Sequence, residues 1–269
     1  MAMRRRMVKK PAIITPAVRK TVYGWRPDVP DHRDHMYGAV RKVPATLPAK
    51  ADLRPGCSKV EDQKDLGSCT ANALAGALEY LMKKDKVKVS DMSRLFIYYN
   101  ERVMEGSVRS DSGAEIRDGI KTLAKQGACR EKSWPYDIAK FAKKPPKVCY
   151  TEALDYQILS YARINTLDEM RACLADGYPV VFGFSVYDGF ESQQIAKTGV
   201  VELPKKGEKM AGGHAVLAVG YDDAAKHLIV RNSWGTDWGM KGYFTLPYGY
   251  VTDRSLSDDF WTIRRGEKM

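Results

Sequence analysis

The sequence predicts an α+β fold, in which a mostly helical half at about residues 47–147 precedes a mostly β half at about residues 148–265. Apolar residues recur at helical spacing at residues 69–85, 90–104 and 114–126 of the first half. In the second half, short apolar segments predict strands at residues 179–186, 213–221, 227–232, 242–246 and 258–263. Five prolines interrupt residues 1–46, which lack a sustained period and are expected to follow an extended path.

The length and composition are those of a globular protein. The chain has 269 residues, of which 44% are hydrophobic, enough for one large or two compact domains. No stretch approaches the roughly 18 consecutive apolar residues of a membrane span. The basic residues 1–10 are followed by an apolar stretch too short and too broken by proline for a secretory signal. We therefore expect no membrane span and no cleavable signal peptide, which favours a cytoplasmic or non-classically secreted protein.

Positive charge is concentrated in the N-terminal arm, residues 1–46. Residues 1–50 hold 12 Lys and Arg against three Asp, whereas residues 51–269 hold 32 against 30. Such an arm is usually a solvated tail, and contact with an anionic partner such as nucleic acid or lipid is an alternative. Aromatic and basic residues mix between Tyr23 and Arg26, but nothing there resembles a nucleic-acid-binding motif.

The first predicted helix carries a candidate nucleophile. Ser68 is placed to cap this helix, so that Cys69 lies in its first turn. The positive end of the helix dipole and a nearby imidazolium would lower the thiol pKa from about 8.5 into a range of about 3.5–7.5. The sequence therefore predicts a thiolate at Cys69 at neutral pH.

A base and its orienting partner are expected on two neighbouring strands. His214 lies at the start of one strand and Asn232 at the end of the next, and a hairpin turn at residues 222–225 would bring them together. The amide oxygen of Asn232 could then accept the imidazole N–H and fix its tautomer, as a carboxylate does in a serine-type triad.

An oxyanion donor is expected at Gln63, six residues before Cys69. Its side-chain amide and the backbone N–H of Cys69 would form an oxyanion hole, in which one donor lowers the barrier by about 3–4 kcal/mol. Each residue also has a structural reading of its own, as a core thiol, a satisfied core histidine or a turn asparagine. Their joint order, with His214 placed 145 positions after Cys69, favours the catalytic reading.

These four residues, with Asn-Ser-Trp-Gly-Thr-Asp-Trp-Gly at residues 232–239, resemble those of papain-like cysteine peptidases. The resemblance implies a papain-like two-lobed peptidase domain over about residues 47–265, with a cleft between a helical lobe and an antiparallel, β-barrel-like lobe. It implies hydrolysis of peptide or protein substrates through a thioester acyl-enzyme, without a cofactor or metal ion. The implied catalytic residues are Cys69, His214, Asn232 and Gln63, and Trp234 would shield the Asn–His hydrogen bond from water.

The resemblance also suggests substrate-binding residues. Backbone groups at Ser112 and Gly113 would pair with the P2 residue of an extended peptide. Gly183, with Gly212 opposite, would leave a roomy S2 pocket, and Asp258 or Asp259 falls near its base. Large P2 residues are then expected, with Arg or Lys accepted if an Asp side chain points inward; the alternative is that both Asp are solvated.

The chain departs from the family at three positions. Leu66 replaces a disulfide cysteine, Thr70 replaces the aromatic residue after the nucleophile, and Gly213 replaces the Asp often found before the His. Five cysteines leave one free nucleophile and up to two bridges, with three possible connectivities. Cys57 and Cys129 are a candidate bridge, whereas Cys173 is interpreted as a core thiol on a helix that opens with a capping box at residues 166–169.

Two other functions could use the same residues. An acyl transferase or amidase would use the Cys-His-Asn set with another amine in place of water. An inactive papain-fold binding or effector protein could use the basic arm to hold anionic partners, although it would have no reason to keep all four catalytic residues.

The arm itself has a predicted role. It is too short and too rich in proline for a helical pro-domain. We expect residues 1–46 to cover the cleft as a built-in inhibitor anchored by Tyr23 and Trp25. A solvated tail is the alternative.

Overall fold

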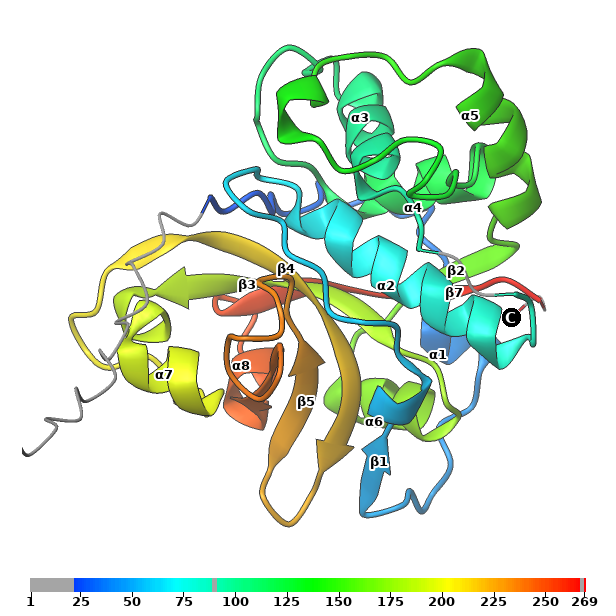
Figure 1. Cartoon of the computed structure of the whole chain (residues 1–269). Helices are drawn as coiled ribbons and strands as arrows, with labels where there is room; N and C mark the ends of the chain where they lie inside the picture. The colour runs from blue at the N-terminus through cyan, green and yellow to red at the C-terminus, as the bar shows by residue number, and fades with distance from the viewer. Residues whose placement is uncertain (1–21, 89–90, 267–268) are drawn as a thin grey trace, which may run out of the picture.

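The computed structural model describes residues 22–88, 91–266 and 269. The long helix α2 (Cys69–Lys84) crosses the middle of the molecule, along the lower edge of the upper of two lobes (Figure 1). The upper lobe of Figure 1 is helical, and its elements are α2 (Cys69–Lys84), α3 (Arg94–Met104), α4 (Ile116–Lys125) and α5 (Lys147–Ala153). The first three helices confirm the predicted ones, with boundaries shifted by up to four residues.

Helix α2 is buried because it is packed on every side. All residues from Cys69 to Met82 are buried, and small residues at Ala71, Ala75 and Ala77 let neighbouring elements approach closely. A helix that is apolar all round is typical of the interior of a protein. One hydrophobic cluster joins α2, its helical neighbours and the inner face of the sheet, including Leu217 on strand β4.

The lower lobe is built on an antiparallel sheet with the strand order β2-β7-β3-β4-β5-β6. In the described part of the chain this sheet is open, because its end strands β2 and β6 do not pair with each other. Its strands are β2 (Ser160–Arg163), β3 (Val180–Tyr187), β4 (Met210–Asp222), β5 (His227–Arg231), β6 (Tyr243–Pro247) and β7 (Ser257–Arg264). Strand β1 (Lys50–Asp52) pairs with β4, and the sequence patterns predicted neither β1 nor β2.

Short elements complete the fold. They are α1 (Tyr37–Val40), η1 (Arg54–Gly56), η2 (Ile138–Lys140), η3 (Leu154–Tyr156), α6 (Leu167–Ala175), η4 (Asp188–Glu191), α7 (Gln193–Thr198) and α8 (Tyr248–Thr252). Thr166 caps helix α6 as predicted, since its Oγ1 accepts a hydrogen bond from the Glu169 N–H, but Glu169 Oε2 accepts from the Asn165 N–H and not from that of Thr166. Cys173 on α6 is fully buried, which confirms it as a core thiol.

Two local predictions are wrong. Ser68 precedes α2 but does not cap it, because its hydroxyl is taken by Tyr136 Oη at 2.5 Å and by Asn72 Nδ2 at 3.1 Å. Cys57 and Cys129 are free thiols and form no bridge. The Sγ atom of Cys57 donates to the carbonyl of Leu53, one turn earlier in the chain, while Cys129 is buried in the helical-lobe core.

Residues 22–46 are part of the fold. In Figure 1 this segment, in blue, starts beside the first turn of α2 and continues to α1 and β1 at the lower right. Tyr37 on α1 is 1% exposed and belongs to the core of the β lobe. Seven of the Lys and Arg residues of the arm lie in residues 1–21, outside the described part, so an anionic partner for them stays a prediction.

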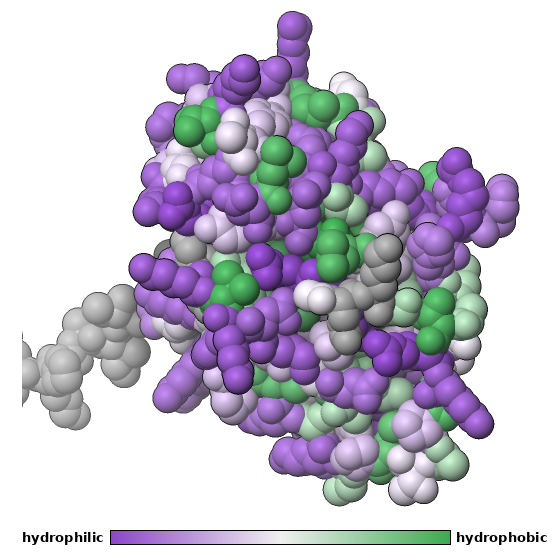
Figure 2. Space-filling model, turned by 90° about the vertical axis from the view of Figure 1, so that its right-hand side faces the viewer, coloured by the Kyte–Doolittle hydropathy of each residue, from purple (hydrophilic) through white to green (hydrophobic). Residues whose placement is uncertain are grey.

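The surface is mainly polar. Figure 2 shows the face at the right of Figure 1, where hydrophilic side chains dominate and apolar ones are scattered. Of the helices in the described ranges, none has both the length and the apolar character needed to cross a membrane.

Candidate active site

The antiparallel strands β4 and β5 bring the predicted base and its partner together. His214 Nε2 lies 2.8 Å from Asn232 Oδ1, so this nitrogen carries the proton of the hydrogen bond. Both side chains are buried, and the Trp234 ring stacks on the imidazole with centroids 5.1 Å apart and an interplanar angle of 28°. Trp234 therefore covers the His–Asn pair, as predicted. The other ring nitrogen, Nδ1, has no hydrogen-bond partner among the described residues.

Gln63 is held in a fixed orientation. Its Oε1 accepts a hydrogen bond from Ser233 Oγ at 2.6 Å, so its Nε2 donor points away from Ser233. Nε2 donates to the carbonyl of Leu66 at 3.0 Å and to the carbonyl of Val22 at 3.2 Å. A carbonyl of the N-terminal arm thus occupies the donor that was predicted to stabilise an oxyanion.

Cys69 is the first residue of α2 and is completely buried. Burial raises the pKa of its thiol to about 11, against the opposing effect of the backbone N–H groups of Ala215, Gly24 and Thr70. Burial likewise lowers the pKa of His214 to about 4, although its hydrogen bond to Asn232 acts in the opposite direction. Burial therefore favours the neutral thiol over the predicted thiolate in this closed state, in which residues 22–25 lie over the site.

The arm pairs with both walls of the cleft through its backbone. The N–H of Trp25 donates to the carbonyl of Gly213 at 3.0 Å on the β lobe. On the helical lobe, the N–H of Ala114 donates to the carbonyl of Gly24 at 2.8 Å, and the N–H of Arg26 donates to the carbonyl of Ala114 at 3.1 Å. A Cβ atom on Gly24 would lie 1.8 Å from the carbonyl oxygen of Gly67, so only glycine fits at this crossing.

Two aromatic side chains of the arm, which flank Gly24 in the sequence, lie against strands β3 and β4. Tyr23 faces His214 edge-on, with ring centroids 6.0 Å apart, and lies 6.4 Å from the Trp234 ring. Trp25, which is 8% exposed, lies directly on Gly183, where a Cβ atom would be 1.9 Å from the indole. The indole Nε1 donates to Asp259 Oδ2 at 3.1 Å.

The substrate-binding residues suggested by the sequence are only partly gathered here. Gly183 lies under Trp25 and Gly212 lies under Tyr23, so the two glycines lie at different positions along the β-lobe wall and do not face each other across one pocket. Gly113 touches the Gly24 carbonyl, whereas Ser112 Oγ bonds to Ser107 and to the carbonyl of Gly113.

Asp259, and not Asp258, faces the pocket that holds Trp25. The Asp258 side chain is 41% exposed and pairs with Arg254, while Asp259 is 1% exposed. The pairing of β3 with β7 shifts register between Val181 and Gly183, and Asp259 has a φ of 56° at that point. Such a bulge changes the direction of the side chain at that point, here Asp259.

Several residues of the site carried no recognisable signal in the sequence. Ala114 makes the backbone hydrogen bonds that were predicted for Ser112 and Gly113. Ser233 and Tyr136 hold Gln63 through hydrogen bonds to its side-chain oxygen and its backbone carbonyl, respectively. Thr70 Oγ1 donates to the buried Glu101, whose pKa is raised to about 8 by burial. No group of three or more His, Cys, Asp or Glu side chains in the described ranges could hold a metal ion.

Comparison with known proteins agrees with this geometry. The family profile described as "Papain family cysteine protease" matches residues 47–258. A peptidase C1-like protein of Acanthamoeba polyphaga mimivirus is 43% identical, over 90% of this chain and 86% of its own length. Pro-cathepsin H of Medicago truncatula is 29% identical, over 81% of this chain and 65% of its own length.

One solved structure is similar to this chain over nearly its whole length. The crystal structure of xylellain, a cysteine protease from Xylella fastidiosa, is 44% identical and has a TM-score of 0.86. The alignment covers 99% of this chain and all of xylellain. Procathepsin L 3 of Tenebrio molitor, at 19% identity, shares the fold with a TM-score of 0.70 over 86% of this chain and 73% of its own. The chain therefore belongs to the papain family of cysteine proteases and is a cysteine peptidase.

Proposed function

We propose that this cysteine peptidase is latent, because residues 22–27 of its own arm close the cleft. We call these residues the cleft segment. One observation carries the proposal: the Val22 carbonyl accepts a hydrogen bond from the Gln63 amide, and Cys69 is completely buried. The oxyanion donor is thus occupied by the protein's own chain, and the nucleophile is covered.

Once the cleft segment has moved away, the four residues can act as the resemblance implies. His214 takes the proton of Cys69, and the thiolate forms a C–S bond to the substrate carbonyl while the oxyanion accepts hydrogen bonds from Gln63 Nε2 and the Cys69 N–H. His214 then gives its proton to the leaving amine as the C–N bond breaks. In the second half of the reaction His214 deprotonates water, which attacks the thioester and releases the acid and the thiol group. Asn232 keeps the imidazole oriented throughout.

The direction of the cleft segment explains why it blocks the site without being a good substrate. If the Trp25 pocket is the S2 pocket, a substrate runs from that pocket towards His214, where its leaving group lies. The cleft segment runs from Tyr23, beside His214, to Trp25, and Trp25 pairs with Ala114 in the parallel sense. It therefore crosses the site in the direction opposite to that of a substrate.

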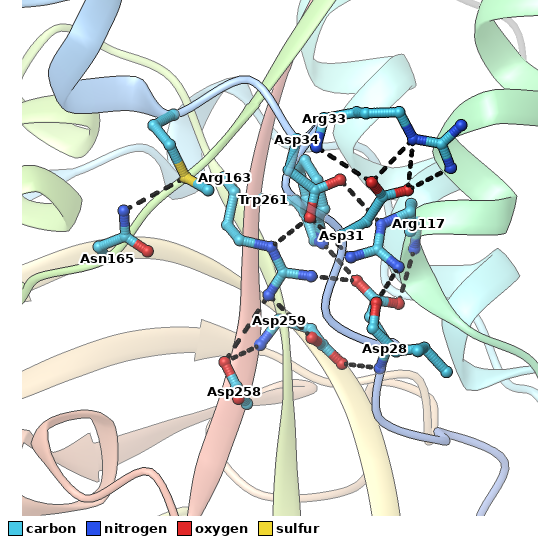
Figure 3. A network of polar contacts seen from close by, with 12 residues as sticks. Asp28, Asp31, Arg33, Asp34, Arg117, Arg163, Asn165, Asp258, Asp259 and Trp261 are labelled. Carbon is cyan, nitrogen blue, oxygen red and sulfur yellow. Dashed lines mark hydrogen bonds and ion pairs between the residues drawn. The ribbon is translucent and has the colours of Figure 1, made fainter.

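A buried network of charges holds the chain directly after the cleft segment (Figure 3). Arg163 on β2 lies at its centre, with Nη2 2.7 Å from Asp28 Oδ2, Nε 3.0 Å from Asp34 Oδ2 and Nη1 3.0 Å from Asp259 Oδ1. Arg117 on α4 makes two further hydrogen bonds to Asp34, at 2.9 and 2.6 Å. These buried hydrogen bonds fix the position of residues 28–34 on the body, and removal of one partner would leave an uncompensated buried charge at a cost of about 3–5 kcal/mol.

This network places the functional boundary inside the arm. Asp28 also accepts hydrogen bonds from the Trp261 indole at 2.8 Å and from the Arg117 N–H at 3.1 Å. Together with the buried Tyr37, these contacts make residues 28–37, which we call the anchor segment, part of the peptidase body. The inhibitor is then the cleft segment alone, and it can leave the cleft while the anchor segment stays in place.

The S2 pocket has a chemical preference in this proposal. Asp259 Oδ2 accepts hydrogen bonds from two groups of the arm, the Trp25 indole and the Asp28 N–H. When Trp25 leaves, this buried oxygen loses one of its two donors. We expect it to favour P2 side chains that carry a donor, Arg and Lys above all, while Arg163 continues to hold Oδ1.

The test compares the full chain with its Gly24→Ala variant. The added methyl group would meet the backbone of Gly67, so the variant should be unable to dock the cleft segment. We expect faster reaction with an epoxysuccinyl thiol probe and faster peptide hydrolysis, and neither in a variant that also carries Cys69→Ala. Unchanged rates for Gly24→Ala would refute latency, and faster transfer to an added amine than to water would favour an acyl transferase.

A further inference from the structure

One side chain of the cleft segment, Tyr23, lies on the side of the active site where the leaving group of a substrate would be. Tyr23 lies beside the imidazole of His214 and the ring of Trp234, and it crosses Gly212, where a Cβ atom would be 2.8 Å from Tyr23 Cβ. Since His214 protonates the leaving amine, the space taken by Tyr23 is the space that the P1′ residue of a substrate needs.

The tip of Tyr23 meets a carboxylate. Tyr23 Oη donates a hydrogen bond to Glu191 Oε1 at 2.5 Å. Glu191 is the last residue of η4, and its neighbour Phe190 is buried against Trp234 and Trp238, with ring centroids 5.4 and 5.6 Å away. These contacts fix η4 relative to the catalytic histidine, so the Glu191 carboxylate is positioned and does not hang from a loose loop.

We propose that Glu191 is a specificity-determining residue that selects the P1′ side chain of the substrate. This inference rests on the proposed release of the cleft segment. With Tyr23 gone, Glu191 lacks the donor that it binds in the closed state. Lys and Arg side chains have about the reach of tyrosine and end in donors, and a positive charge makes the hydrogen bond stronger. Leucine offers no donor, and glutamate is repelled.

The expected preference for a basic P1′ side chain comes from direct contact with Glu191 and not from a broad negative surface. Residues 188–208 hold four acidic side chains against three lysines, so the charge of this loop is nearly balanced. Asp188 belongs to the same turn as Glu191, and its one hydrogen bond to the described residues runs from its backbone N–H to the carbonyl of Lys209. Asp188 is therefore a matched control for the loss of one negative charge from η4.

The experiment uses the full chain with Tyr23→Ala and Trp25→Ala, so that the cleft is open while the anchor segment is untouched. Internally quenched peptides that differ only at P1′ (Lys, Arg, Tyr, Leu or Glu) report kcat/KM. We expect Lys and Arg to be preferred over Leu, and Glu191→Gln to reduce that preference by up to about fivefold, the effect of one solvent-exposed ion pair. Tyrosine should be affected less, because the glutamine amide oxygen still accepts from a hydroxyl. Asp188→Asn should leave all ratios unchanged.

If these peptides are cleaved with a P1′ preference that Glu191→Gln does not change, the inference is refuted while the peptidase assignment and its latency stand. A second measurement needs no peptide substrate. In the full chain, Tyr23→Phe and Glu191→Ala should each speed reaction of Cys69 with the thiol probe, and the double variant should react no faster than the quicker single variant. Independent, multiplying effects would show that Glu191 does not bind the hydroxyl and would also overturn the inference.

Discussion

Replacing Trp25 with alanine should uncover Cys69 while leaving both lobes intact. The indole is 8% exposed, and burying such a side chain removes about 150–250 Å² from water, worth about 4–6 kcal/mol at about 25 cal/mol per Å². Alanine keeps a small part of this contact and loses the hydrogen bond to Asp259, so docking of the cleft segment should weaken by about 3 kcal/mol. At about 1.4 kcal/mol per tenfold, the open fraction should rise up to about 100-fold.

The second-order rate of Cys69 labelling by an epoxysuccinyl probe measures this open fraction. Trp25→Phe, which keeps most of the area but loses the N–H donor, should give a smaller increase. Val29→Ala is the matched control, because the Val29 side chain is 68% exposed and should not affect docking. If Trp25→Ala labels at the rate of the parent chain in a folded, monomeric sample, the indole does not hold the cleft segment and the reasoning fails.

Four further predictions follow from the same contacts. In the open Trp25→Ala background, Gln63→Ala should slow peptide turnover about 100–1,000-fold but still allow probe labelling, because one oxyanion donor is lost. A chain that begins at Leu47 lacks the anchor segment, and its melting temperature should fall by about 10 °C or more, as calorimetry would show. In the same open background, Asp259→Asn should lower the Arg-to-Leu preference at P2 about tenfold, and Asp258→Asn should not, in a P2 peptide library. Burial, and then repulsion by Asp259, raises the pKa of Asp28 to about 7, so attachment of the anchor segment takes up a proton. The stability that this proton uptake contributes is fully present below about pH 4 and is lost as the pH rises through about 7. The melting temperature of the parent chain relative to Asp28→Asn should therefore fall from about pH 5 to about pH 8, and a constant difference would contradict this.

The catalytic residues could be predicted because their signals are local and ordered along the chain. Cys69 opens an apolar helix, and the hairpin between β4 and β5 places His214 beside Asn232 whatever the rest of the fold does. The two lobes followed from a change in hydrophobic period. The contact of Tyr23 and Trp25 with the cleft was also predictable, since two aromatic residues in an exposed arm require a surface on which to pack.

The remaining features depend on tertiary contacts that no local pattern encodes. Asp259 was not distinguishable from Asp258, because a bulge in the pairing of β3 with β7 decides which one faces the pocket. The hydroxyl of Ser68 was expected to cap α2, but Tyr136, which is 68 residues away, competes for it. The anchor segment appeared to be tail because its partners, Arg117 and Arg163, lie on separate elements of the body.

The rate of Cys69 modification in the full chain and in a chain that begins at Asp28 tests the central claim most directly. The shorter chain keeps the anchor segment and loses the cleft segment, and peptide mapping by mass spectrometry shows which cysteine reacts. Our account predicts that the shorter chain is labelled at Cys69 at least about tenfold faster, with a similar melting temperature. Equal rates at Cys69 in two folded, monomeric samples would show that residues 22–27 do not restrain the enzyme.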